Sequence, residues 1–427
     1  MRIVDVCAFY SPLGGGVKTY VRHKMRAGPR LGHEIIVLVP SIQPGVEIVG
    51  PGARIEYVEG KPFPLDKRYN YFYDEAALHA KLNALKPDFV EASTPWSSAG
   101  IVARWRTDVP RSLIMHADPL GNYAYRWFRG VASRPMIDRG FEWFWQRLRR
   151  LDERFDHIIC ASSDLTARLK EGGLKKVVMN RMGVEPDIFS PANRDLNARR
   201  YLLKLCDLPE HALLLVGAGR HAPEKRWPMI IQAVTASGYK HPIGLIIAGD
   251  GRCSAAVHKA VAGNPHIRLI SPILDRNEFA TFLASGDALV HGSESETFCM
   301  IAAEARASGL PMLVPDSGAV AEHLVTNAGY HYHSAKAASL AQAIRRLAGE
   351  GTASHQATAR VAAHDTRTMD EHFKDLFDLY TCSVRSKAGA GTAWRDLSLH
   401  RAKPGLSMAP TRASDVVRTS SHTSKVD

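Results

Sequence analysis

The sequence predicts an α/β protein that contains two doubly wound parallel sheets. Short, uninterrupted apolar runs alternate with longer segments of helical pattern, and such runs are typical of strands in parallel sheets that helices cover on both faces. The same alternation restarts after Gly183–Asp195, so we expect two domains. Ligands of such sheets bind at the carboxyl ends of the strands. We therefore expect the functional residues directly after the strands.

Ten apolar runs are the expected strands. They are residues 2–9, 34–40, 88–93, 112–118 and 157–162 in the first half, and 212–219, 243–251, 266–272, 287–293 and 311–317 in the second. The organisation we expect is an N-terminal domain, a C-terminal domain, a closing helix and a disordered basic tail, at 1–190, 191–365, 366–384 and 385–427. The tail is rich in Gly, Ala, Ser, Thr, Pro and basic residues and has too few periodic apolar residues to form a core. Within the closing helix, we expect one apolar face made by Phe373, Leu376, Phe377 and Tyr380.

Composition narrows the class of protein. Of the 427 residues, 45% are hydrophobic and 23% charged, as in a soluble globular protein. No apolar run approaches the roughly 20 residues of a membrane span, and the N-terminus lacks the pattern of a signal peptide. The six cysteines are scattered without CxxC spacing, which favours a reduced, cytoplasmic protein without a structural zinc site.

The net charge of +12 favours an anionic partner. A nucleic-acid-binding protein is one alternative, but no recognition helix, RNA-recognition or zinc pattern supports it, and we expect no nucleic acid. The other anionic partners are a nucleotide and a membrane surface.

A glycine-rich turn follows the first expected strand. Gly14, Gly15 and Gly16 precede a helix that we expect from about Val17. A backbone without side chains lets a ligand approach closely, and the unpaired N–H groups of a helix start attract an anion. A tight turn that simply requires glycine is the alternative.

A basic loop follows the strand at 212–219. It places Arg220 and Lys225 ahead of the next helix, and a guanidinium fork with a lysine charge suits a diphosphate. The alternative is a solvated basic loop. The sequence GAG at this point does not extend to the full GxGxxG dinucleotide fingerprint.

The third motif, SESETFCMIAAEARASGLPMLVPDSGAVAE, contains Glu296 and Glu304. We expect a helix from about Thr297 to Ser308, on which eight residues leave two side chains roughly 80° apart. Glu296 would then lie at the helix start, where a capping box with Ser293 is the alternative to a ligand. Glu304 would lie inside the helix, where an exposed helical acid is the alternative. Its alanine neighbours favour burial, and a buried carboxylate needs a partner, such as the vicinal hydroxyls of a ribose or a hexose.

Taken in order, these motifs resemble the retaining glycosyltransferases of family 4, which have the GT-B fold of two Rossmann-like domains facing a cleft. The resemblance rests on SPLGGGVKTYV, MHAD, MGVEPDIFSP, GAGRHAPEKRW, IAGDG and the E-x7-E pattern in ESETFCMIAAE, and it covers roughly residues 1–380. It departs from many members in the residues TFCM and in the charged HAPEKRWP loop, which leaves the donor open.

The resemblance implies a donor site made by these motifs. Its expected residues are Gly15, Gly16, Arg220, Lys225, Glu296, Phe298, Cys299, Met300, Ile301 and Glu304. Arg220 and Lys225 would hold the donor diphosphate, and Glu304 the ribose hydroxyls. Backbone N–H groups of Phe298–Ile301 would contact the sugar and the phosphate.

The resemblance also implies the catalytic residues His116, Glu296, Arg220 and Lys225. Glu296 would bind hydroxyls of the transferred sugar, and His116, otherwise an ordinary strand-end histidine, would lie beside that sugar. Gly15 and Gly16 would face the phosphate or the acceptor. Arg220, Lys225 and a helix dipole could stabilise the leaving diphosphate without a metal, so we expect neither a metal nor a cofactor.

The expected reaction is retaining hexosyl transfer from a nucleoside-diphosphate sugar, of the GDP-mannose or UDP-glucose type, to a glycan or a lipid-linked acceptor. Retention would come from attack on the same face, with the leaving phosphate taking the acceptor's proton, and domain closure would exclude water. A sugar-nucleotide epimerase or a phosphorylase of the same fold is the alternative.

Residues 123–150 combine aromatic side chains with many arginines. They could contact an anionic membrane near the acceptor entrance, which would place the protein at the inner face of the cytoplasmic membrane. Alternatively, the aromatics belong to the core and the arginines are a solvated rim.

Overall fold

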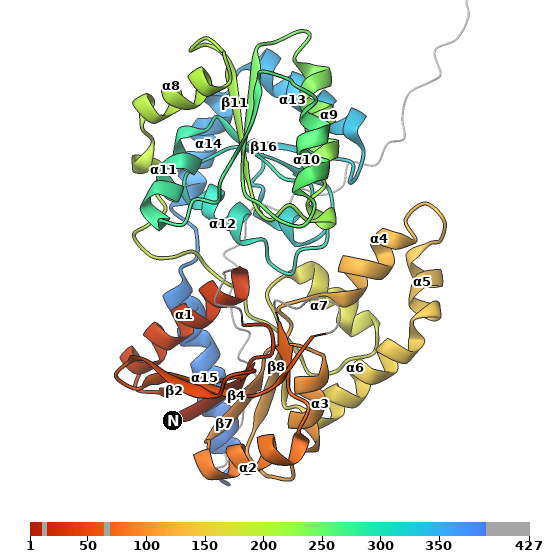
Figure 1. Ribbon diagram of the computed structural model, residues 1–427, viewed down its shortest axis with the longest axis vertical. Coiled ribbons are helices and arrows are strands. Elements are labelled where there is room, and N and C mark those ends of the chain that lie inside the picture. The colour runs from red at the N-terminus through yellow and green to blue at the C-terminus, as the bar shows by residue number, and fades with distance from the viewer. Residues whose placement is uncertain (11–14, 64–68, 390–427) are drawn as a thin grey trace, which may run out of the picture. The chain divides into compact units, whose positions relative to one another are not determined.

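The computed structural model describes residues 1–10, 15–63 and 69–389, which contain two separate large sheets (Figure 1). The first sheet lies within residues 2–179 and the second within residues 213–332. All ten expected strands are present. The domain boundary at residue 190 falls between the sheets but stays a prediction, because residues 1–389 cluster as one unit.

The first sheet has eight strands in the order β10-β9-β8-β7-β1-β2-β4-β3. Their bounds are Arg2–Val6 (β1), Glu34–Ser41 (β2), Gly45–Gly50 (β3), Ala53–Glu59 (β4), Phe89–Ala92 (β7), Arg111–Ile114 (β8), His157–Cys160 (β9) and Val177–Met179 (β10). All neighbouring strands pair in parallel except β3, which pairs antiparallel with β4. The antiparallel β3 is an edge strand that was not predicted from the sequence, because it is half-exposed and lacks the continuous apolar run of a buried strand. Two short strands, Lys61–Pro62 (β5) and Asn70–Tyr71 (β6), form a separate hairpin-like pair.

The second sheet has six parallel strands in the order β13-β12-β11-β14-β15-β16. Their bounds are Leu213–Ala218 (β11), Ile243–Ala248 (β12), Ile267–Ile270 (β13), Ala288–Val290 (β14), Met312–Pro315 (β15) and Gly329–Tyr332 (β16). β11 and β12 are buried along their whole length, as expected of central strands that helices cover on both faces. The strand order reverses between β11 and β14, which is where such sheets bind ligands.

Helices cover both large sheets (Figure 1). Around the first sheet they are Gly16–Arg30 (α1), Glu75–Leu85 (α2), Ser97–Arg104 (α3), Tyr125–Trp127 (α4), Arg134–Gly140 (α5), Glu142–Arg154 (α6) and Ser163–Glu171 (α7). Around the second they are Leu196–Leu205 (α8), Trp227–Ser237 (α9), Ser254–Val261 (α10), Arg276–Ser285 (α11), Met300–Ala307 (α12), Ala337–Glu350 (α13) and Ala353–Ala363 (α14). A π-helical turn, Leu120–Ala124, precedes α4, and short 3-10 turns occur at Pro191–Asn193, Pro223–Lys225 and Ala319–His323.

The last helix, α15 (Met369–Lys387), returns to the first sheet. The ring of Tyr380 stacks on Phe89 of β7 with a centroid distance of 3.8 Å, and its hydroxyl donates to Glu91 Oε2 at 2.6 Å. The four residues of the predicted apolar face are all buried. The predicted bounds of this helix are shifted, because a capping box between Thr368 and Glu371 starts it at Met369, and it continues to Lys387. Most of the predicted tail, residues 390–427, lies outside the described residues.

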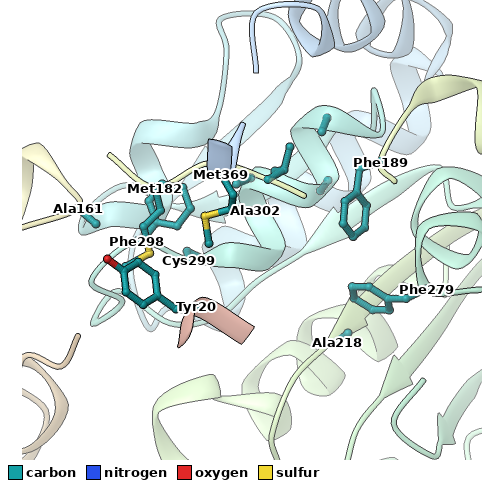
Figure 2. Packing of buried hydrophobic residues seen from close by; sticks show 14 of the residues in the cluster. Tyr20, Ala161, Met182, Phe189, Ala218, Phe279, Phe298, Cys299, Ala302 and Met369 are labelled. Atoms are coloured by element: carbon teal, nitrogen blue, oxygen red, sulfur yellow. The ribbon is translucent and has the colours of Figure 1, made fainter. Parts of the chain in front are cut away.

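One buried apolar cluster connects α1, the second sheet, α12 and α15 (Figure 2). It includes Tyr20, Phe298 and Ala302, and it continues to the pair of Phe189 and Phe279, whose rings meet edge to face at 6.2 Å. The motif that contains Glu296 and Glu304 is thus anchored in the core by its small and aromatic members.

Candidate functional site

The predicted site residues lie where parallel sheets place them, after the strands. Gly15 follows β1, His116 follows β8, Lys225 follows β11 and Glu296 follows β14. The loops after β8 and β14 meet, because Thr297 Oγ1 donates to the backbone oxygen of His116 at 3.2 Å.

Lys225 and Glu296 form the centre of the site. Lys225 Nζ donates to Glu296 Oε1 at 2.6 Å, and the two side chains are 15% and 20% exposed. His291 Nε2 lies 3.5 Å from the same oxygen. Burial alone would raise the pKa of Glu296, but the charge of Lys225 and the contact with His291 outweigh it and hold the pKa well below its ordinary value. Glu296 is therefore an ionised acceptor of hydrogen bonds, and the capping box with Ser293 is not formed.

The helix after Glu296 begins later than predicted. α12 starts at Met300 rather than near Thr297, because Cys299 adopts a left-handed conformation with φ 72°. Phe298 is buried, and its backbone oxygen accepts from His323 Nε2 at 2.6 Å. The backbone N–H groups at the start of α12 lie in its first turn, where a helix leaves them without intrahelical partners. The contact of the Phe298–Ile301 backbone N–H groups with phosphate remains a prediction.

Glu304 lies inside α12 and is buried. Its carboxylate pairs with the guanidinium of Arg276, the first residue of α11. Burial raises the pKa of Glu304, and the charge of Arg276 opposes that rise. Arg276 also pairs with Glu185 Oε2 at 3.1 Å and lies over the rings of Phe189 and Phe279. Glu304, which the resemblance assigns to the ribose hydroxyls, is thus already paired with a side chain of the protein.

Arg220 is placed differently from Lys225. Its side chain is 55% exposed, and its guanidinium lies 3.5 Å from Glu224, four residues on. Both cations come from the loop after β11, but only Lys225 reaches Glu296. The 3-10 turn Pro223–Lys225 separates the two side chains.

His116 contacts α1, the helix that the glycine turn precedes. The His116 ring packs edge to face on Tyr20 of α1 with a centroid distance of 4.5 Å. Burial lowers the pKa of His116 to about 4, so the ring is neutral at pH 7. Gly15 caps α1 with φ 107°, and a Cβ on Gly15 or Gly16 would meet no described atom within 4 Å. Among the described residues nothing fills the space beside these two glycines, and Gly14 lies outside the described residues.

Sequence reasoning missed a second charged group at the same loops. Arg226 donates from Nε to Glu294 Oε2 at 3.0 Å, and Arg129 from α4's C-terminal turn pairs with the same carboxylate. Arg226 has φ 52° and directly follows Lys225. The two acids of Ser293–Glu296 could have indicated this second ion pair from the sequence. Glu296 binds Lys225, and Glu294 binds the next residue of the same loop, Arg226.

Comparison with known proteins identifies the family of this chain. The family model described as Glycosyltransferase Family 4 matches residues 14–188, and the model described as Glycosyl transferases group 1 matches residues 210–350. Together the two matches cover well over half of the chain. The chain belongs to glycosyltransferase family 4.

Among curated relatives, a GDP-mannose-dependent alpha-mannosyltransferase of Mycobacterium tuberculosis (strain CDC 1551 / Oshkosh) is 28% identical over 323 residues, which are 74% of this chain and 80% of that protein. A GDP-mannose-dependent alpha-(1-6)-phosphatidylinositol dimannoside mannosyltransferase of Mycobacterium tuberculosis (strain ATCC 25177 / H37Ra) is 26% identical over 334 residues, covering 77% and 83%. This family 4 chain is thus a glycosyltransferase with mannosyltransferases among its relatives.

Solved structures show the GT-B fold. Sucrose-phosphate synthase from Thermosynechococcus elongatus superposes with a TM-score of 0.71 at 17% identity, covering 92% of this chain and all of that one. HepE of Anabaena, solved in complex with UDP-glucose, has a TM-score of 0.66 at 15% identity and covers 90% and 100%. The predicted fold class of two Rossmann-like domains is confirmed.

Two further properties concern membranes and metals. No helix in the part of the chain that the structure describes is both long and apolar enough to cross a membrane. The same residues contain no group of three or more His, Cys, Asp or Glu side chains arranged to hold a metal ion.

Proposed function

We propose that this glycosyltransferase moves mannose from GDP-mannose to a glycan or glycolipid acceptor with retention of configuration and without a metal. The observation that carries the proposal is the pair of Lys225 and Glu296, which offers one cation and one ionised acceptor at the same strand ends. The relatives named for GDP-mannose support this donor. UDP-glucose, which HepE binds, is the second candidate donor.

The diphosphate would bind between Lys225 and the start of α12. Lys225 provides a largely desolvated charge, and the eight-residue α12 adds the positive end of its dipole. Arg220 is mostly exposed, and its guanidinium lies 3.5 Å from Glu224. Its side chain would change conformation to bind the diphosphate instead of Glu224. These charges would stabilise the negative charge that grows on the leaving diphosphate, so that no metal is required for that task.

The two acidic residues would bind the two sugars of the donor. Glu296 is held ionised and would accept hydrogen bonds from hydroxyls of the transferred sugar. Glu304 would accept from the ribose hydroxyls with the oxygen that Arg276 does not hold, since Arg276 contacts Oε1. His116, neutral at pH 7, would donate to or accept from the transferred sugar without carrying charge.

The reaction would proceed on one face of the sugar. The bond from C1 to the phosphate oxygen breaks, the acceptor oxygen bonds to C1 from the same side, and the acceptor's proton passes to the departing phosphate. No protein base is needed, which agrees with the low pKa values of His116 and Glu296, since each would be a poor base.

A donor screen with mass spectrometry tests this proposal. The protein is incubated with octyl α-mannoside and, in separate reactions, GDP-mannose, UDP-glucose or no donor, each with and without EDTA. We expect a mannosylated product from GDP-mannose that EDTA does not reduce. A free epimer or sugar 1-phosphate as the product would instead indicate an epimerase or a phosphorylase, and loss of transfer with EDTA would contradict metal independence.

We also propose that residues 123–150 contact an anionic membrane next to the acceptor. Part of this segment is core, since Phe144, Trp145 and Leu148 are buried. Several large apolar side chains are nevertheless exposed: Tyr123, Trp127, Phe128, Val131, Met136 and Trp143. Exposed arginines accompany them: Arg129, Arg134, Arg139 and Arg150. Aromatic side chains with nearby cations suit the interface of an anionic bilayer.

Vesicle co-sedimentation tests the membrane contact. We expect binding to vesicles that contain phosphatidylglycerol, weaker binding to phosphatidylcholine alone, and about tenfold less binding when Trp127 and Trp143 are both changed to Ser. Tyr239→Ser is the matched control, because Tyr239 is 88% exposed on another part of the chain. Equal binding by the double variant and the control would contradict this contact.

A further inference from the structure

A cavity of about 180 Å³ is lined by Phe298 but not by Lys225. It is formed by the turn after β9, by residues 181–183, by α12 and the 3-10 turn after β15, and by residues 365–367 that lead into α15. Ala161, Met182 and Phe298, labelled in Figure 2, form part of its apolar wall. Its volume is several times the ~30 Å³ that a water molecule occupies in the liquid.

Three arginines line this cavity: Arg181, Arg306 and Arg367. Arg181 pairs with Glu322 at 3.1 Å, and Arg367 donates to Asp375 Oδ2 at 2.5 Å. Arg306 has neither an ion pair nor a side-chain hydrogen bond with any described residue. Asp365, the remaining acid of the cavity wall, is not within the 4.0 Å of an ion pair with it. The charge of Asp365 acts on the Arg306 guanidinium from a distance, but no acid among the described residues forms an ion pair with it.

Several polar atoms of the same wall are buried without a partner. They are Nε of Arg306, Nε of Arg367 and Oγ1 of Thr366. Leaving a buried donor unpaired costs about 1–3 kcal/mol, and more when the donor is charged. Three such donors beside one cavity indicate a ligand that accepts several hydrogen bonds and carries negative charge.

The surrounding acids do not fill this role. Glu322 accepts from the backbone N–H groups of Ser163 and Asp164 at 3.1 and 2.9 Å, so that its carboxylate already caps α7 and holds Arg181. The alternative, that the arginines only support neighbouring backbone, applies to Arg367, which donates to the backbone oxygen of Glu371. It does not apply to Arg306, which has no such bond.

We propose that this cavity binds phosphate, as the free ion or as a small phosphate monoester, through Arg306, Arg367 and Thr366. A tetrahedral oxyanion accepts from several donors at once and matches guanidinium geometry. Neither Lys225 nor Arg220 lines this cavity, although Phe298, whose backbone N–H the donor site would use, forms part of its wall. Bound phosphate would touch both α12 and the segment before α15, where Val184 and Thr368 form a single isolated parallel bridge. It would thereby connect the two segments of chain that run between the two sheets.

Isothermal titration of the full chain with inorganic phosphate and, separately, glycerol 3-phosphate tests this site. We expect binding in the natural protein and in Lys225→Met, which removes the donor-site cation. We expect at least about tenfold weaker binding in Arg306→Gln and in Thr366→Val, since a hydrogen bond to a charged group contributes about that factor. Arg106→Gln, an exposed arginine at the opposite end of the first sheet, is the matched control.

The outcomes separate this proposal from the proposed function. Tighter binding of glycerol 3-phosphate than of phosphate would identify a monoester as the ligand, and the reverse would identify the free ion. Phosphate binding that Lys225→Met abolishes, or that Arg306→Gln and Thr366→Val leave unchanged while both remain folded by circular dichroism, would overturn the site. Loss of sugar transfer in Lys225→Met would bear only on the proposed function.

Discussion

Replacing Lys225 by methionine removes the cation of the site while keeping most of the volume of its side chain. The Glu296 carboxylate then loses its ion pair with Lys225 and keeps its contact with His291. Loss of one partner of a buried ion pair costs about 3–5 kcal/mol. Since the two side chains keep 15% and 20% exposure, we expect the lower end of that range, about 3 kcal/mol of unfolding free energy.

The same change removes charge that would stabilise the leaving diphosphate. Loss of one such group typically lowers kcat by about 10²–10³, and we expect a fall in transfer of that size. The sign of the pH effect follows from Glu296, whose pKa is lowered in the folded protein from an ordinary value of 4.5. Its contribution to stability is present above pH 4.5 and is lost as the pH falls further. The stability difference between the natural protein and Lys225→Met should therefore be largest near neutral pH and shrink in acid.

Urea unfolding and initial rates of transfer measure both effects. Lys240→Met, at an exposed position, is the matched control, and the double variant Lys225→Met/Glu296→Gln should recover part of the lost stability because it no longer buries an unpaired carboxylate. Natural stability and transfer in Lys225→Met would refute the assigned role of the pair. A loss of stability that Glu296→Gln does not relieve would refute the coupling.

Three further predictions concern other residues. Glu304→Gln should raise KM for the donor by about 10- to 100-fold with a smaller change in kcat, because it weakens charged hydrogen bonds to the ribose; an unchanged KM would remove Glu304 from the site. Gly16→Ala should leave the melting temperature unchanged, since a Cβ there meets no described atom, but it should lower kcat/KM. The control is Gly349→Ala, at an equally open glycine in α13, which should leave kcat/KM unchanged. Equal effects of the two variants on kcat/KM would show that no ligand uses the space at the start of α1. Burial raises the pKa of Glu91 although its ion pair with Lys24 opposes that rise. The folded protein therefore holds a proton that the unfolded chain releases, and stability falls as the pH rises above 4.5. In Glu91→Gln the unfolding free energy should fall less with rising pH, and an identical pH dependence would contradict the raised pKa.

The strands and their functional loops could be predicted from sequence because both depend on local pattern. Continuous apolar runs identified all ten expected strands, and their ends identified the loops of Lys225 and Glu296. The half-exposed β3 was missed because its burial pattern is not that of a covered strand. The start of α12 was misplaced because the left-handed conformation of Cys299 is set by its surroundings, and cysteine has no intrinsic preference for it.

Partners distant in sequence could not be predicted. Glu304 was expected to require a partner, and the structure provides Arg276, which is positioned by α11 and by the rings of Phe189 and Phe279. The pairing of Glu294 with both Arg226 and Arg129 depends likewise on how three loops meet. Spacing along the chain predicts which loops converge, but it does not specify which cation reaches which carboxylate.

The stereochemistry of the product tests the central claim most directly. The protein is supplied with octyl α-mannoside and GDP-mannose labelled with ¹³C at C1 of the mannose, and the one-bond coupling between C1 and H1 of the new glycoside is measured by nuclear magnetic resonance. The account predicts a single α-linked mannoside together with released GDP. A β-linked product would contradict retention, and GDP-mannose left unconsumed would contradict the proposed donor.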